Sequence, residues 1–97
     1  MKLAQLERSI LEDFIYYHLV IFPHEGQSGH DYPVAYKTMR NAEKTAKKLI
    51  KTGKYYSIMV RRNEVIKQVP YTTDFSINSP VIELKGNEVK YYENRVN

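Results

Sequence analysis

Basic side chains crowd the middle of this sequence and are the residues best suited to chemistry with a partner. Ten basic and two acidic residues lie between Lys37 and Lys67, whereas the rest of the chain has five basic and nine acidic residues. That segment therefore carries a formal charge of +8 and the remainder −4, although the whole chain shows only +4. Lysine and arginine arrays bind phosphates and release counterions when they do so. The charge pattern predicts that one side of the molecule attracts an anionic partner.

Most of these basic residues have helical spacing. Thr38 is a typical N-cap residue, apolar residues recur every three or four positions up to Ile50, and Gly53 is typical of the position after a helix end. At about 100° per residue, the basic side chains fall within an arc of about 120° opposite the apolar stripe. We call this set the basic ridge, and its members are Arg40, Lys44, Lys47, Lys48, Lys51 and Lys54.

The following segment extends the predicted basic surface. Tyr55 to Arg61 and Glu64 to Val69 are strand-like runs, and Arg62-Asn63 between them suggests a two-residue reversal with both arginines at its turn. Tyr55 and Tyr56 offer rings for stacking single-stranded bases. We therefore expect a nucleic-acid site made of Arg40, Lys44, Lys47, Lys48, Lys51, Lys54, Arg61 and Arg62. The competing interpretation is an ordinary lysine-rich helix surface facing solvent.

Tyrosine is the second unusual feature, with nine copies in 97 residues and no tryptophan. Adjacent tyrosines on a strand point to opposite faces, so one member of each pair lies outside the core. Exposed rings favour protein interfaces, and we expect Tyr55, Tyr91 and Tyr92 to serve in one. The hairpin from Val81 to Tyr92 is expected to form an edge that pairs two copies into a homodimer.

Other chemistries have weaker support in the sequence. His24-Glu25 and His30-Asp31 combine ligand types, but their separation matches no recognised metal-ligand spacing. No serine lies in a G-x-S-x-G turn, and no Gly-Lys-Ser/Thr follows Gly26. The chain has no cysteine, which excludes thiolate nucleophiles and disulfides. We expect no metal, no cofactor and no enzymatic activity, with His18 facing a polar partner in a strand.

The length of 97 residues fits one domain, residues 1–97. Its 42% hydrophobic and 12% aromatic content exceeds that of disordered chains. No apolar run approaches the 18 to 20 or so residues that span a bilayer. We expect a cytoplasmic protein without membrane contact.

The elements that must position these residues follow from periodicity and turn chemistry. The expected order is a helix at Lys2 to Asp13, a strand at Phe14 to Phe22, a flexible loop at Pro23 to Pro33, an optional strand at Val34 to Lys37, the basic helix, the two strand-like runs, a polar connection at Pro70 to Pro80, and a frayed tail at residues 93–97 after the last hairpin. In that hairpin Gly86-Asn87 turns the chain, which pairs Leu84 with Val89, Ile82 with Tyr91 and Glu83 with Lys90.

This order, α-β-(β)-α-β-β-β-β, predicts an α+β domain with two helices on a mostly antiparallel sheet of four to six strands. Without a strand at Val34 to Lys37, the sheet would be mixed. We expect a non-enzymatic accessory protein that binds nucleic acid through its basic helix. The alternative is an interaction or inhibitor module, of bacterial or mobile-element origin, that presents the basic face to an acidic protein and dimerises through tyrosine-rich strands.

Overall fold

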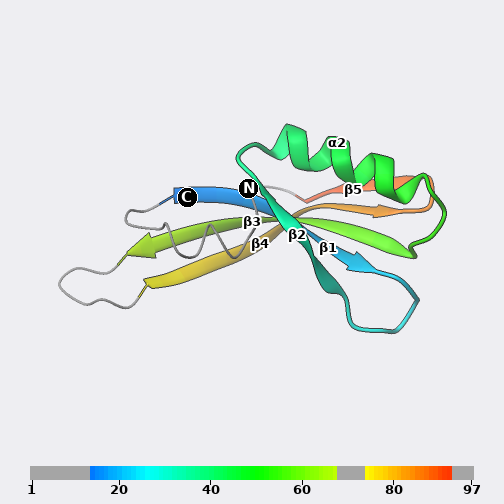
Figure 1. The fold of residues 1–97 in the computed structure, drawn as a ribbon, viewed down its shortest axis with the longest axis horizontal. Helices are drawn as coiled ribbons and strands as arrows, with labels where there is room; N and C mark the ends of the chain where they lie inside the picture. The colour runs from blue at the N-terminus through cyan, green and yellow to red at the C-terminus, as the bar shows by residue number, and fades with distance from the viewer. Residues whose placement is uncertain (1–13, 68–73, 93–97) are drawn as a thin grey trace.

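The computed structural model describes residues 14–67 and 74–92 (Figure 1). These residues form one five-stranded antiparallel sheet in the order β2-β1-β3-β4-β5, with a single helix on one face. The α+β class is thereby confirmed, whereas the predicted helix at Lys2 to Asp13 and the predicted tail at residues 93–97 lie outside the described residues. The element bounds are β1 Phe14–Phe22, β2 His30–Tyr36, α2 Met39–Ile50, β3 Ser57–Lys67, β4 Asp74–Lys85 and β5 Glu88–Tyr91.

The helix α2 forms where the sequence predicts it. Thr38 is the N-cap, and its side-chain oxygen accepts a hydrogen bond from the Asn41 backbone N–H at 3.2 Å. Ala42, Ala46 and Ile50 lie on the buried side of α2. The two alanines let the helix approach the sheet closely, and Gly53 reverses the chain with φ of +74°.

The hydrophobic core lies between α2 and one face of the sheet. The fully buried side chains beneath the helix alternate along the three central strands and are Leu19 and Ile21 of β1, Ile58 and Val60 of β3, and Ile82 and Leu84 of β4. Figure 1 shows α2 over one end of the sheet, while β3 and β4 run on beyond it. No helix among residues 14–67 and 74–92 is long and apolar enough to cross a membrane.

The second strand is longer than the sequence suggests. β2 begins at His30, so the predicted loop at Pro23 to Pro33 ends at residue 29, and all described strand pairs are antiparallel. Pro33 is tolerated because β2 is an edge strand, and residues 32–34 together lie opposite Leu19 in an irregular part of the pairing. At Gly29 a Cβ would lie 2.7 Å from Val20 Cγ1, so any other residue would force its neighbours to shift and glycine suits this close return.

The predicted reversal at Arg62-Asn63 is wrong. β3 continues through both residues and pairs with β1 on one side and β4 on the other, which gives a central strand more ladder hydrogen bonds than a local hairpin. The predicted polar connection at Pro70 to Pro80 is also wrong from residue 74 onward, because those residues belong to β4; residues 70–73 lie outside the described part.

A β-bulge interrupts the pairing of β3 with β4. Val60 pairs with Ile82 and Arg61 pairs with Pro80, which leaves Val81 as an extra residue in β4. Proline has no backbone N–H to donate to a neighbouring strand, and the irregular pairing at the bulge tolerates Pro80 for this reason. The extra residue also allows Val81 and Ile82 to be buried in succession.

The last hairpin forms in the predicted register. Leu84 pairs with Val89, Ile82 with Tyr91 and Glu83 with Lys90, and Gly86 takes φ of +59° in the two-residue turn. The hairpin places β5 at the sheet edge opposite β2.

Candidate nucleic-acid interface

The basic ridge lies on the side of α2 that faces away from the sheet as far as Lys48, and Lys51 is the C-cap of the helix. The predicted helical position of Lys54 is wrong, because α2 ends at Ile50 and Gly53 turns the chain before it. Lys47 is half-exposed and pairs with Glu43, whereas the other five members form no ion pair with any described carboxylate. These five exposed residues, which we call the free cations, are Arg40, Lys44, Lys48, Lys51 and Lys54. Figure 1 shows no described element on the outer side of α2. The free cations are therefore available to a partner from solvent.

Glu43 is the acidic residue within the ridge, and it is already engaged. Its carboxylate accepts a hydrogen bond from Lys47 Nζ at 2.8 Å and another from the Tyr91 hydroxyl at 2.7 Å. The Lys47 and Tyr91 hydrogen bonds hold the Glu43 pKa below its usual value, and the same carboxylate raises the pKa of Lys47 and of Tyr91. This cluster joins α2 to β5. Within the basic ridge, Lys47 is the cation whose charge the Glu43 carboxylate offsets.

Helix physics favours basic residues at this end even without a ligand. Lys47 and Lys48 lie in the last turn of α2, where the carbonyl ends give the helix a partial negative charge. The dipole accounts for part of the ridge, but the attraction falls off within a turn and does not account for Arg40 or Lys44.

The structure does not bring Arg61 and Arg62 to the ridge. As consecutive residues of β3 they point to opposite faces of the sheet. The Arg62 side chain is 19% exposed and lies 3.5 Å from a Glu64 oxygen. Arg61 lies opposite His18 on the face away from α2, and its buried Nε has no hydrogen-bond partner among the described residues. The missing turn at Arg62-Asn63 explains why both lie elsewhere.

The three interface tyrosines differ in exposure. Tyr91 is 58% exposed on β5, whereas Tyr55 and Tyr92 are partly buried. The Tyr92 hydroxyl donates to Glu83 at 3.1 Å, and Lys90 Nζ lies 4.7 Å from the centre of the Tyr92 ring. Tyr55 packs against the core cluster. Of the three, Tyr91 is thus the residue most accessible to a partner protein.

A hollow of about 700 Å³ lies where the ridge ends. It is bounded by the end of α2 with the segment after it and by the turn between β4 and β5. We call it the ridge-end hollow, and it is lined by Ile50, Gly53, Tyr55, Tyr56, Lys85, Gly86, Asn87 and Glu88.

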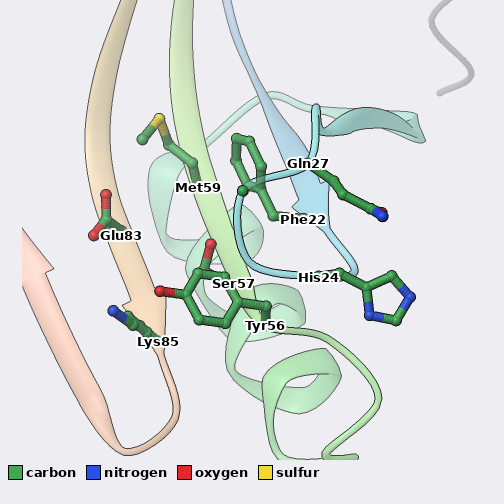
Figure 2. Close-up of a pocket in the computed structure, with 9 residues that line it drawn as sticks. Phe22, His24, Gln27, Tyr56, Ser57, Met59, Glu83 and Lys85 are labelled. Atoms are coloured by element: carbon green, nitrogen blue, oxygen red, sulfur yellow. The ribbon is translucent and has the colours of Figure 1, made fainter.

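A smaller pocket of about 310 Å³ lies on the sheet face away from α2 (Figure 2). Its lining residues are Phe22, His24, Gly26, Gln27, Tyr56, Ser57, Met59, Glu83 and Lys85. Both charged groups on its β4 wall have partners, because Glu83 accepts from Tyr92 and the Lys85 ammonium lies 4.8 Å from the centre of the Tyr56 ring. Figure 2 shows the His24 ring turned away from Ser57. The pocket offers an apolar floor but no arranged nucleophile and base.

Sequence reasoning missed a buried polar cluster on the same face. His18 is 5% exposed, its Nδ1 lies 2.7 Å from Asn63 Nδ2, and its Nε2 lies 3.6 Å from Asp31 Oδ1. Burial lowers the His18 pKa, Asp31 opposes that shift, and Arg61 adds to it. The expectation that His18 faces a polar partner agrees with this arrangement. The only signal in the sequence is one histidine inside an apolar strand, because the sequence predicts a turn at Asn63.

The two histidine-acid steps do not form a shared site. Asp31 approaches His18 instead of His24, and within residues 14–67 and 74–92 no group of three or more His, Asp or Glu side chains is placed to hold a metal ion. No protein-family model matches this chain, and neither the curated proteins nor the solved structures contain a match.

Proposed function

We propose that this protein binds nucleic acid through the basic ridge on α2, without catalysing a reaction. The observation that supports the proposal is the set of five free cations, three on the exposed face of α2 and two in the segment directly after it. Unpaired surface cations attract polyanions over distances of about a Debye length, roughly 8 Å at physiological ionic strength. Phosphate contacts of this kind supply affinity without sequence readout.

The length of the ridge suits a nucleic-acid backbone. The 12 residues of α2 rise about 18 Å, at about 1.5 Å per residue. One strand of duplex DNA carries a phosphate about every 3.4 Å along its axis, so the helix spans about five phosphates. Arg40, Lys44 and Lys48 lie within this length, which supports contact with several phosphates at once. Lys51 and Lys54 follow its C-terminal end. Arg61 and Arg62 are not part of the proposed surface.

Filter binding with random-sequence DNA and RNA tests this proposal. Lys44→Glu with Lys48→Glu reverses two free cations and should abolish retention at low salt, whereas Lys37→Glu with Lys90→Glu makes the same charge change outside the ridge. We expect the control variant to keep most of the affinity. For the unchanged protein, affinity should fall steeply with salt, by about 0.9 in logarithmic slope for each duplex phosphate neutralised.

Two outcomes would count against the proposal. If the unchanged protein retains neither nucleic acid at low salt, an acidic protein becomes the preferred partner of the ridge. If the two double variants lose binding equally, net charge and not the ridge governs the contact.

The edge strand β5 supports a second candidate function, pairing with another protein chain, and we propose a second copy of this chain as that partner. Val89 is 40% and Tyr91 58% exposed. Lys85 and Glu88 flank a two-residue turn, so their backbone groups bond to each other. Such pairs alternate with non-bonded pairs along an antiparallel ladder. The backbone N–H and C=O groups of Val89 and Tyr91 therefore face outward. No described strand covers them. An edge of this kind is a template for strand addition.

Light scattering at high micromolar concentration tests the pairing. Val89→Pro removes an outward N–H without removing a bond to β4, and it should convert a dimer to a monomer. Val89→Thr keeps the N–H and a strand-forming side chain, so it should leave the dimer intact. A monomer for the unchanged protein would refute the self-association.

A further inference from the structure

Two of the residues that line the ridge-end hollow are glycines in turns, and they add no side chain to it. Gly53 and Gly86 adopt φ of +74° and +59°, a conformation that other residues rarely take, and a Cβ built on either would meet no atom within 4 Å. The turn that ends α2 and the turn that joins β4 to β5 thus each require glycine, which also adds no side chain to the hollow. A hollow of about 700 Å³ lies within the usual size range of ligand pockets.

The free cations lead to this hollow. Lys51 follows Ile50 at the C-cap of α2, and Lys54 lies in sequence between Gly53 and Tyr55. Ile50, Gly53 and Tyr55 all line the hollow. A phosphate chain that follows the ridge from Arg40 therefore reaches the rim at its last two cations.

The electrostatics of the hollow favour a neutral group over a phosphate. The C-terminal end of α2 carries a partial negative charge, and Glu88 adds a carboxylate to the lining. The ammonium of Lys85 is held over the Tyr56 ring at 4.8 Å, and the Tyr56 contact is the main cause that raises the Lys85 pKa (Figure 2). Phosphates should therefore stay on the free cations, while an uncharged group enters the hollow.

The lining suits the flat, polar-edged shape of a nucleobase. Tyr55 is half-buried against the core, so its ring is held in place at low entropic cost. Exposed Asn87 and Glu88 provide an amide and a carboxylate, which bond to the edge of a base. Aromatic stacking beside a basic track is how proteins bind single strands with little sequence preference.

We propose that the ridge-end hollow holds one unpaired base while the free cations hold the backbone, so that the ligand is a single-stranded nucleic acid. This inference rests on the proposed function of the ridge. A base in a duplex is stacked and paired, and it enters the hollow only if it leaves the helix. The hollow thereby distinguishes single strands from an intact duplex.

Fluorescence anisotropy with two labelled oligodeoxynucleotides of equal length, one with its bases and one fully abasic, tests the inference at low salt. Both carry the same phosphates, so the ridge contributes equally to each. We expect the intact strand to bind at least about fivefold more tightly, the ratio that stacking of one base gives. Tyr55→Leu should bring the intact strand to the affinity of the abasic strand. Tyr32→Leu alters another partly buried tyrosine, on β2, and should keep the difference.

Each result identifies which idea fails. Equal affinity of the unchanged protein for both strands, with loss of binding in Lys44→Glu with Lys48→Glu, overturns the role of the hollow and leaves the ridge intact. Binding of neither strand overturns the proposed function itself. The comparison of intact and abasic strands requires no variant, so it decides the matter even if Tyr55→Leu fails to fold.

Discussion

The two faces of the sheet use polar chemistry in opposite ways. On the side of α2, the fully buried sheet residues beneath the helix are apolar, and the free cations lie on the outer surface of the helix and just beyond its end. On the other side, His18 and Asn63 are buried within the sheet face and bound to one another. The first arrangement leaves charge available to a partner, and the second uses polar groups to hold the strands in one register.

This comparison predicts that substitutions differ in their effect on stability and on binding. A buried group affects the free energy of unfolding because its environment has no water to replace a lost contact. An exposed cation is solvated in both the folded and the unfolded chain, so its loss affects a partner far more than the fold.

The apolar face should show the largest effect on stability. Ile82→Ala removes a fully buried side chain beneath α2 and should lower the free energy of unfolding by about 2 to 5 kcal/mol. Chemical denaturation measures the loss. A change below about 1 kcal/mol would show that α2 does not pack on β4 as described.

The polar cluster should come second. Asn63→Ala leaves His18 Nδ1 buried without its partner and should cost about 1 to 3 kcal/mol, with little change in nucleic-acid affinity. Urea denaturation and filter binding on the same sample separate the two quantities. A loss of affinity at unchanged stability would instead make this face part of the binding surface.

Acidification should weaken the same cluster. Because burial lowers the folded-state pKa of His18 below its ordinary 6.5, the unfolded chain binds a proton more readily in this range. The His18 contribution is complete above about pH 6.5 and is lost as the pH falls toward the lower folded-state pKa. The Glu43 contribution is lost only below its ordinary 4.5.

Urea midpoints at pH 7.5, 6.5 and 5.5 check this dependence. His18→Gln removes the titrating group, so its midpoint should vary less with pH than that of the unchanged protein. Parallel profiles for the two proteins would mean that another group is responsible.

The ridge should show the smallest effect on stability. Lys44→Glu with Lys48→Glu should shift the free energy of unfolding by only tenths of a kcal/mol, because exposed helix charges contribute little to the fold. Thermal melts followed by circular dichroism measure the shift. A large destabilisation would mean that loss of binding by this variant reflects unfolding, and the contrast between the two faces would disappear.

The features that could be predicted from the sequence are those that depend on neighbours in the chain. The cap at Thr38, the alanines of α2 and the turn at Gly86-Asn87 act over a few residues, and each was predicted at the position where it occurs. The part of the basic ridge within α2 belongs to the same class, because helical spacing alone places Arg40, Lys44, Lys47 and Lys48 on one side of the helix.

The path of β3 could only be decided by the tertiary structure. A pair of polar residues at Arg62-Asn63 resembles a turn locally, but β1 and β4 bind the strand on both sides. The same long-range pairing placed Asn63 beside His18 and separated Arg61 and Arg62 onto opposite faces. The sequence by itself therefore determined the helix and its charge, whereas strand partners distant in the chain decided which charges remained available, because ladder hydrogen bonds form only after those strands meet.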